Sequence, residues 1–165
     1  MSEIQFGTAG YRSLTATPAH IHAIGQAIVA YAQDTGVQTV LIGYDTRAMN
    51  PAYSQILAQL FQAMDIPVVA WDDPLPTPVI ADTVARYPQA LGVILTASHN
   101  PPAYTGLKLV MSRGEPAPES VTQVIQDRAN QALATHAIVR PASPVAAFVT
   151  RLLARVTAHM GPLWI

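Results

Sequence analysis

The feature that most constrains the fold is a regular alternation of short apolar runs with longer amphipathic segments. The apolar runs, which contain Val, Ile or Thr, cover residues 39–45, 67–71, 90–98 and 107–112. Runs that stay apolar throughout are typical of strands buried on both faces. Because such strands alternate with helices, we expect an α/β fold, a three-layer α/β/α sandwich with a mostly parallel mixed sheet.

Prolines mark the predicted starts of helices. Four short polar residues each precede a proline and an amphipathic run: Thr17, Asn50, Thr77 and Ser143. A short polar side chain can accept hydrogen bonds from the first turn of a helix, and proline at the first helical position loses none. The pattern predicts a cap at each of the four residues. It also predicts that the first helix ends at Gly36 and that another begins near Pro118.

The two ends of the chain carry further predictions. The run at 107–112 follows the run at 90–98 after a short loop, so we expect it to pair antiparallel at an edge of the sheet, and residues 3–12 predict one more strand. We assign residues 1–140 to one domain and residues 141–165 to a linker and the start of a second domain. The last segment has an apolar stripe, which includes Phe148, Leu152 and Val156, and such a stripe needs a covering partner.

Composition narrows the possible partners. The formal net charge is −1, which gives no general attraction to nucleic acid or to an anionic membrane. The chain has no cysteine, which excludes disulfides and thiolate metal sites. It lacks a basic, then apolar, N-terminal leader and any apolar run long enough to cross a bilayer. We therefore expect a cytoplasmic protein with neither nucleic acid nor membrane as a partner.

Polar residues follow the predicted strands at the edge where α/β sheets bind ligands. Asp45 and Arg47 follow one strand, Asp72 and Asp73 a second, and the tripeptide Ser98-His99-Asn100 a third. Each group has a structural alternative. Ser98 and Asn100 are common turn residues, Asp72 and Asp73 suit a turn better than a metal, and the Asp45–Arg47 pair suits a brace. Adjacent Ser and His on a strand point to opposite faces and do not form a nucleophile–base pair.

The order of four motifs decides between these alternatives. The segments "FGTAGYR", "GYDTR", "PTPV" and "TASHNPPAYTGLK" follow one another over roughly residues 4–133. In order and spacing they resemble the first domain of the α-D-phosphohexomutases, the family of phosphoglucomutase, phosphomannomutase and phosphoglucosamine mutase. The resemblance implies interconversion of hexose 1-phosphate and hexose 6-phosphate through an enzyme-bound phosphoserine.

The resemblance also implies roles for single residues. Ser98 would carry the phosphoryl group, and its phosphate would supply one ligand to Mg²⁺. Arg12 and Lys108 would neutralise the charge of the transferring group, as expected where a protein stabilises phosphoryl transfer. His99 would orient the phosphoserine or assist proton transfer, and Thr8 and Asn100 would bind the hexose phosphate substrate.

Chain length departs from the resemblance. Members of the family have four domains, and their second domain supplies the remaining magnesium ligands, whereas no "DGDxDR"-like element occurs here. We therefore expect the catalytic-serine domain alone, with the later domains as missing partners and with negligible mutase turnover. The alternative is a stand-alone, non-catalytic module that binds a phosphosugar or a protein.

Overall fold

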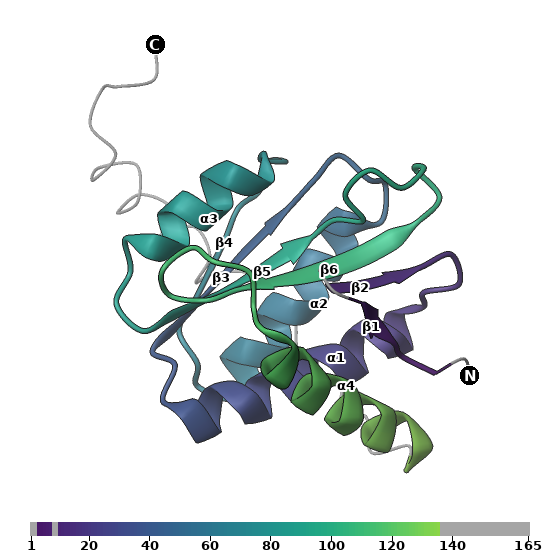
Figure 1. Ribbon diagram of the computed structural model, residues 1–165, viewed down its shortest axis with the longest axis horizontal. Helices are drawn as coiled ribbons and strands as arrows, with labels where there is room; N and C mark the ends of the chain where they lie inside the picture. Colours follow the sequence, from purple (N-terminus) through teal and green to yellow (C-terminus); the bar gives the residue numbers. More distant parts are fainter. Residues whose placement is uncertain (1–2, 8–9, 136–165) are drawn as a thin grey trace.

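The fold is built on a six-stranded mixed sheet (Figure 1). The computed structural model describes residues 3–7 and 10–135. The strands of the sheet are β1 (Phe6–Gly7), β2 (Gly10–Ser13), β3 (Thr39–Tyr44), β4 (Val68–Ala70), β5 (Ala90–Leu95) and β6 (Thr105–Val110), in the spatial order β1-β2-β6-β5-β3-β4. The strands β3, β4 and β5 are mutually parallel, β6 is antiparallel to β5, β2 to β6, and β1 to β2. Strands β2, β3, β4 and β5 therefore run in one direction, and β1 and β6 run in the opposite one. This confirms the mostly parallel mixed sheet.

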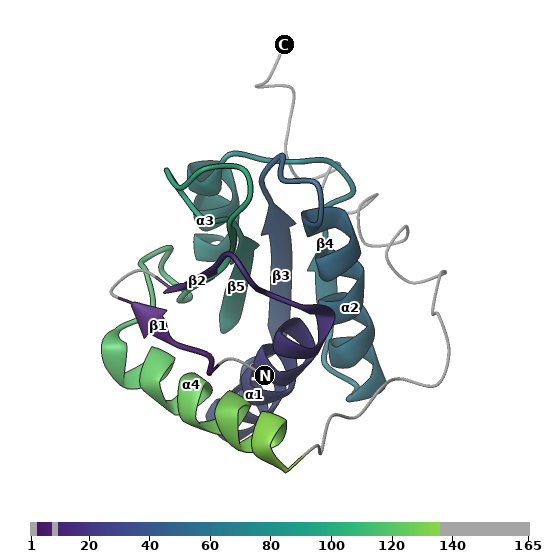
Figure 2. The same ribbon diagram turned by 90° about the vertical axis from the view of Figure 1, so that its right-hand side faces the viewer.

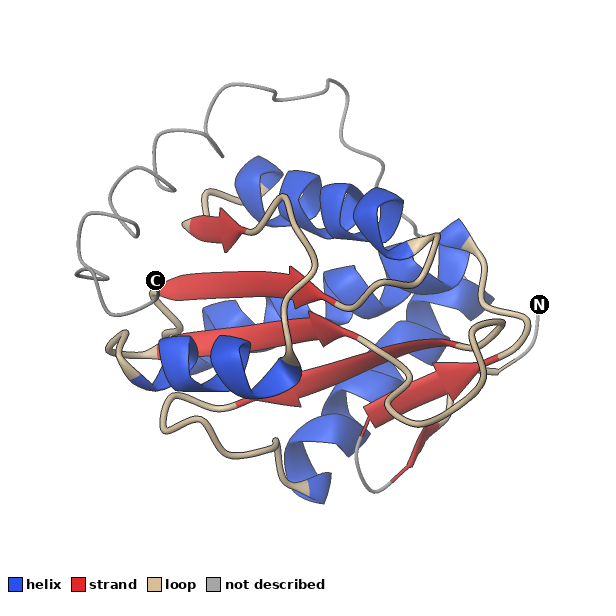
Figure 3. Ribbon diagram, turned by 90° about the horizontal axis from the view of Figure 1, so that it is seen from above, coloured by secondary structure: helices blue, strands red, loops and turns tan. Residues whose placement is uncertain are grey.

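Helices cover both faces of this sheet, as the alternation of elements predicted. Helices α1 (Pro18–Thr35), α2 (Asn50–Ala63) and α4 (Glu119–Ala134) lie on one face, and α3 (Thr77–Ala85) lies on the other (Figures 2 and 3). A large apolar core joins α1, α2 and α4 to the sheet, and a smaller one joins α3 to β3, β4 and β5. The three-layer α/β/α sandwich is thereby confirmed.

The polar residue and proline pairs predicted where helices α1, α2 and α3 begin, but not all of the residues that cap them. Thr17 does cap α1: its Oγ1 accepts from the backbone N–H of His20, and the His20 ring accepts from the backbone N–H of Thr17. The prediction was wrong for Asn50 and Thr77, which are the first residues of α2 and α3, whereas Met49 and Pro76 occupy the cap positions. Ser143 lies outside the described residues.

For the strand predicted at 107–112, the pairing was confirmed and the edge position was wrong. This strand corresponds to β6, which pairs antiparallel with β5 as expected, but β6 is an interior strand. The opening segment forms two short strands instead of one, and these two extend the sheet beyond β6.

Side-chain amides of α4 secure the N-terminal segment. The Asn130 amide donates to the Ile4 carbonyl and accepts from the Ile4 N–H, both at 2.8 Å. The Gln126 side chain accepts from the Phe6 N–H at 2.7 Å. These bonds join the first described residues to the last described helix.

Within residues 3–7 and 10–135, every helix is too short or too polar for a membrane span. The predicted linker and second-domain start at 141–165 lie outside the described residues, as does the apolar stripe with Phe148, Leu152 and Val156.

Candidate functional site

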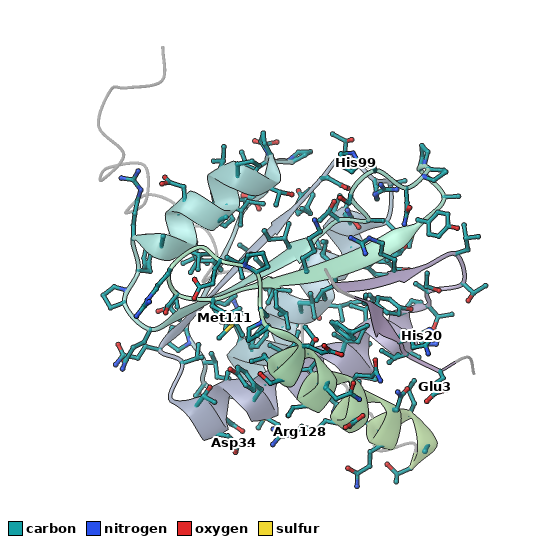
Figure 4. All side chains as sticks on the ribbon, in the orientation of Figure 1. Glu3, His20, Asp34, His99, Met111 and Arg128 are labelled. Atoms are coloured by element: carbon teal, nitrogen blue, oxygen red, sulfur yellow. The ribbon has the colours of Figure 1, made fainter. Side chains whose placement is uncertain are left out.

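The carboxyl ends of β3 and β5 bring two of the predicted polar groups together. Strand β3 leads into Asp45 and Arg47, and its neighbour β5 leads into Ser98. We call residues 96–104, between β5 and β6, the serine loop. Figure 4 shows His99 of this loop at the opposite end of the molecule from the Asp34 and Arg128 side chains.

Ser98 has an unusual backbone conformation. Its φ is 59°, in the left-handed region, which for a residue other than glycine costs about 1–3 kcal/mol and persists only where neighbours impose it. The Ser98 N–H donates to the hydroxyl of Thr96 at 3.0 Å. The side chain is partly exposed, so the hydroxyl of Ser98 is held at the surface and is not in the apolar core.

The carboxylate of Asp45 stabilises this conformation of Ser98 through Thr96. Thr96 donates its hydroxyl proton to Asp45 at 2.7 Å while it accepts from Ser98. The amide of Asn50 donates to the same carboxylate at 2.7 Å and to the carbonyl of Leu95 at 2.9 Å. Asp45 therefore joins the start of α2 to the end of β5 and fixes the hydroxyl that holds Ser98.

Arg47 binds the other side of the serine loop. Its guanidinium donates to four loop carbonyls: those of Ser98 (3.2 Å), Asn100 (2.8 Å), Pro101 (2.6 Å) and Tyr104 (3.1 Å). It also forms an ion pair with Asp45 at 3.1 Å, and its side chain is only 10% exposed. A guanidinium has five donors in a rigid plane, so it can hold several carbonyls at once. The sequence suggested a brace at Asp45 and Arg47, and these contacts are those of a brace.

Two cationic side chains project from the same face of the sheet, and one of them, Lys108, reaches Ser98. Lys108 of β6 places its Nζ 3.5 Å from the Ser98 Oγ, at the outer limit of a hydrogen bond. Arg12 of β2 pairs in register with Gly106, two residues before Lys108, so both side chains project from one face. The α1–α4 core includes Leu107 and Leu109, which places Arg12 and Lys108 on the face that carries α3.

The surroundings of Lys108 favour its uncharged form. Partial burial lowers the pKa of Lys108, and the charge of Arg12 lowers it further. No carboxylate is recorded as an ion-pair partner of either side chain in the described residues. The pair therefore provides positive potential next to a hydroxyl, an environment that favours an anion.

The remaining predicted site residues lie around this group. His99 is exposed at the tip of the loop, and Asn100 is partly exposed with its N–H bonded to the Ala97 carbonyl at 3.2 Å. Thr8 lies outside the described residues. The structure thus brings Ser98 and Lys108 together and places Arg12 on the neighbouring strand, which sequence order alone does not show.

Gly106 was missed in the sequence and has a clear steric role. A Cβ at this position would lie 2.3 Å from the Thr96 carbonyl oxygen and 2.8 Å from the Ala97 Cα. Only glycine therefore allows β6 to approach the start of the serine loop. The signal was present, since glycine inside a strand pattern often marks a close approach of two backbones.

The donor set does not make a complete magnesium site. In the described part of the chain, no three His, Asp or Glu side chains gather closely enough to hold a metal ion. Mg²⁺ requires near-octahedral oxygen coordination, and Ser98 offers one such oxygen. The Asp45 carboxylate already bonds to Arg47, Asn50 and Thr96. Asp72 and Asp73 are exposed, and the Asp72 carbonyl accepts from the Tyr44 hydroxyl.

Comparison with known proteins gives a consistent result. The family model described as phosphoglucomutase/phosphomannomutase, alpha/beta/alpha domain I, matches residues 3–136. A phosphoglucomutase of Komagataeibacter xylinus is 34% identical over 144 residues, which cover 79% of this chain and 26% of that protein. A phosphoglucosamine mutase of Methylibium petroleiphilum is 33% identical over 141 residues, which cover 80% of this chain and 31% of that protein.

A solved structure agrees in fold. The crystal structure of a protein described as a phosphomannomutase from Thermus thermophilus superposes with a TM-score of 0.74 at 32% identity, over 78% of this chain and 30% of that one. The chain thus spans about a quarter to a third of the length of the relatives it matches. The fold, the serine loop and the match over residues 3–136 together show that this chain belongs to the phosphoglucomutase/phosphomannomutase family, to whose alpha/beta/alpha domain I it corresponds.

Proposed function

We propose that this chain is the phosphoserine domain of a phosphohexomutase and that Ser98 carries the phosphoryl group. The observation that supports this most directly is the contact of 3.5 Å between the Ser98 Oγ and the Lys108 Nζ. Among the described residues, Lys108 has no carboxylate as an ion-pair partner. A hydroxyl beside such a cation is suited to carry a phosphate dianion. Arg12, on the same face of the next strand, adds a second positive charge.

The transfer step follows from the positions of these groups. A hydroxyl oxygen of a hexose monophosphate forms a bond to phosphorus as the bond from phosphorus to the Ser98 Oγ breaks. The sugar hydroxyl gives its proton to the imidazole of His99, and the Ser98 Oγ takes one up from the ammonium group of Lys108. Lys108 is close enough to Ser98 to give this proton, its lowered pKa makes it a better acid, and the reverse step returns both protons. The reverse step, with the other phosphate of the hexose bisphosphate, restores the phosphoserine.

The other predicted residues have supporting roles in this proposal. Arg12 stabilises the charge on the equatorial oxygens of the transferring phosphoryl group. His99, exposed at the loop tip, orients the phosphate or assists proton transfer, and Asn100 and Thr8 contact the substrate. Mg²⁺, when bound, would polarise the phosphoryl group through one ligand on the phosphate of Ser98, with its other ligands supplied from outside the described residues.

A labelling experiment tests the assignment of Ser98. The 165-residue chain is incubated with glucose 1,6-bisphosphate and Mg²⁺, and phosphorylated peptides are located by mass spectrometry. We expect slow labelling of Ser98 alone, and none in the Ser98→Ala variant, because one transfer for each molecule does not require sustained turnover. Ser112→Ala is the matched control, because Ser112 is an exposed serine just beyond β6, and it should label like the parent chain. Equal labelling of the Ser98→Ala variant would overturn the assignment.

A coupled assay tests the expectation of inactivity. Because the described residues lack a complete magnesium site, we expect negligible conversion of glucose 1-phosphate to glucose 6-phosphate by this chain alone. Turnover at rates of about 1–1000 per second, ordinary for enzymes, would contradict it. In the alternative of a non-catalytic module, the protein-binding face was the stripe with Phe148, Leu152 and Val156, which lies outside the described residues.

A further inference from the structure

The peptide that follows Ser98 is held by one of its two polar groups only. Its carbonyl, that of Ser98, accepts from Arg47 at 3.2 Å. Its N–H, that of His99, has no recorded hydrogen-bond acceptor among residues 3–7 and 10–135. The peptide preceding Ser98 is held as well, since the Ser98 N–H donates to Thr96. Both peptides that flank Ser98 are therefore fixed.

The direction of the His99 N–H follows from peptide geometry. No cis peptide bond occurs in the described chain, and in a trans peptide the carbonyl and the N–H point in opposite directions. Because the Ser98 carbonyl points at Arg47, the His99 N–H points away from Arg47. Free backbone donors held in one direction next to a nucleophile are the usual means of stabilising a developing oxyanion.

The rest of the loop explains why Arg47 determines this direction. The carbonyls of Asn100 and Pro101, both bound by Arg47, precede Pro101 and Pro102, which have no N–H to donate. The Asn100 N–H is used locally, on the Ala97 carbonyl. Of the residues from Ser98 to Pro102, only His99 therefore retains a backbone donor without a recorded acceptor in the described chain.

We propose that Arg47 is a positioning residue, which turns the Ser98–His99 peptide so that the His99 backbone N–H donates to a phosphoryl oxygen on Ser98. This inference rests on the proposed function, because it needs a phosphate at Ser98. It separates the backbone of His99 from its imidazole, which is exposed at the loop tip. Arg47 acts through the loop, and its own guanidinium is occupied by Asp45 and the four carbonyls.

The test uses the 165-residue chain with phosphoserine encoded genetically at position 98, so that it does not depend on transfer from a sugar. The backbone amide signals are followed by ¹⁵N NMR while pH is varied across the second phosphate ionisation, at about pH 6. We expect the His99 amide to move downfield more than any other loop amide as the phosphate becomes a dianion. The charged or titratable side chains around this phosphate are Arg12, Lys108, Arg47, Asp45 and His99, and the His99→Ala variant removes the contribution of the imidazole.

Four variants identify the cause of the shift. His99→Ala should keep the downfield amide, because the N–H remains when the imidazole is removed. Arg47→Lys and Arg47→Gln should lose most of the shift, since neither side chain can bind four carbonyls. Arg86→Lys is the matched control, because Arg86 lies on the surface in an exposed ion pair with Asp82, and it should behave like the parent chain. Arg47→Lys covers the case in which Arg47→Gln fails to fold.

The outcomes separate this inference from the proposed function. An unmoved His99 amide in the phosphorylated parent chain would overturn the backbone donor. A full shift in Arg47→Lys would overturn the positioning role of Arg47. Either result leaves the labelling of Ser98 by glucose 1,6-bisphosphate intact, whereas absence of that labelling removes the proposed function and this inference together.

Discussion

One arginine–aspartate ion pair supports the serine loop and another joins α1 to α4, and the two pairs differ in exposure and in their other hydrogen bonds. The Arg47 side chain is 10% exposed and its partner Asp45 is 29% exposed, whereas Arg128 is 37% exposed and its partner Asp34 is 59% exposed. Arg47 also bonds to four carbonyls, but Arg128 has no recorded bond beyond Asp34 in the described chain. The comparison indicates that the same pair of charges shapes a loop in one place and joins two helices loosely in the other.

Removal of the two arginines is the strongest test of this difference. Arg47→Ala leaves Asp45 without its cation and four carbonyls without their donor, so we expect a loss of about 3 kcal/mol in the free energy of unfolding. Arg128→Ala removes an exposed pair and should cost less than about 1 kcal/mol. Urea unfolding of both variants measures the two losses in the free energy of unfolding. Equal losses would show that the contacts of Arg47 with the serine loop stabilise the protein no more than the exposed pair does.

A methyl group added to two strand glycines tests the packing of the same regions. Gly106→Ala places a Cβ against the Thr96 carbonyl oxygen and the Ala97 Cα, and overpacking of this kind costs about 2 kcal/mol. Gly7→Ala, on β1 near α4, meets nothing nearer than 3.9 Å and should change stability by less than about 0.5 kcal/mol. If thermal unfolding shows Gly106→Ala to be as stable as Gly7→Ala, β6 does not support the loop as described.

Two residues with a left-handed backbone conformation are expected to change stability in opposite directions when they are substituted. Ser98 has φ 59° in the loop, and Gly36 has φ 70° at the end of α1. Ser98→Gly should relieve strain and raise the free energy of unfolding by about 1 kcal/mol, whereas Gly36→Ala should lower it by about 1 kcal/mol. Chemical unfolding of both variants checks the signs. A destabilised Ser98→Gly would mean that the serine is not strained.

The smallest expected effect concerns the cation beside the serine. Because the pKa of Lys108 is lowered in the folded chain, its charged form destabilises that state, fully so below the folded pKa. Lys108→Met should therefore raise the melting temperature slightly, by about 2 °C near neutral pH. The advantage should shrink as pH rises through the folded pKa towards 10.5, the pKa of the unfolded state. An advantage that grows with pH would contradict this sign.

Much of the fold could be predicted from local pattern, and the errors have physical causes. The strand runs and the Gly36 stop depend on local properties and were confirmed. The predicted cap at Asn50 was wrong because its side chain bonds to Asp45 and Leu95 instead, and at α3 the cap position is occupied by Pro76 and not by Thr77. The interior place of β6 depends on strands formed by a distant segment, which adjacency in sequence cannot reveal.

The site was harder to predict than the fold. The motif predicted that Ser98 and Lys108 belong to one site, and the structure brings them together, but Arg47 binds the loop through backbone carbonyls. Every residue has such a carbonyl, so the identities of the loop residues give no sign of the contact. The positive φ of Ser98 was equally hidden, because serine does not by itself favour that conformation.

The amide bonds between α4 and the N-terminal segment have a consequence for how this fold is made. Ile4 is fully buried, and its polar backbone groups are satisfied by Asn130, 126 positions later. Until Asn130 has been synthesised, the buried N–H and carbonyl of Ile4 lack these partners, so the place of Ile4 in the fold is completed late. The ladder between β2 and β6 does not involve α4, so these amide bonds finish the edge of the sheet and do not begin it.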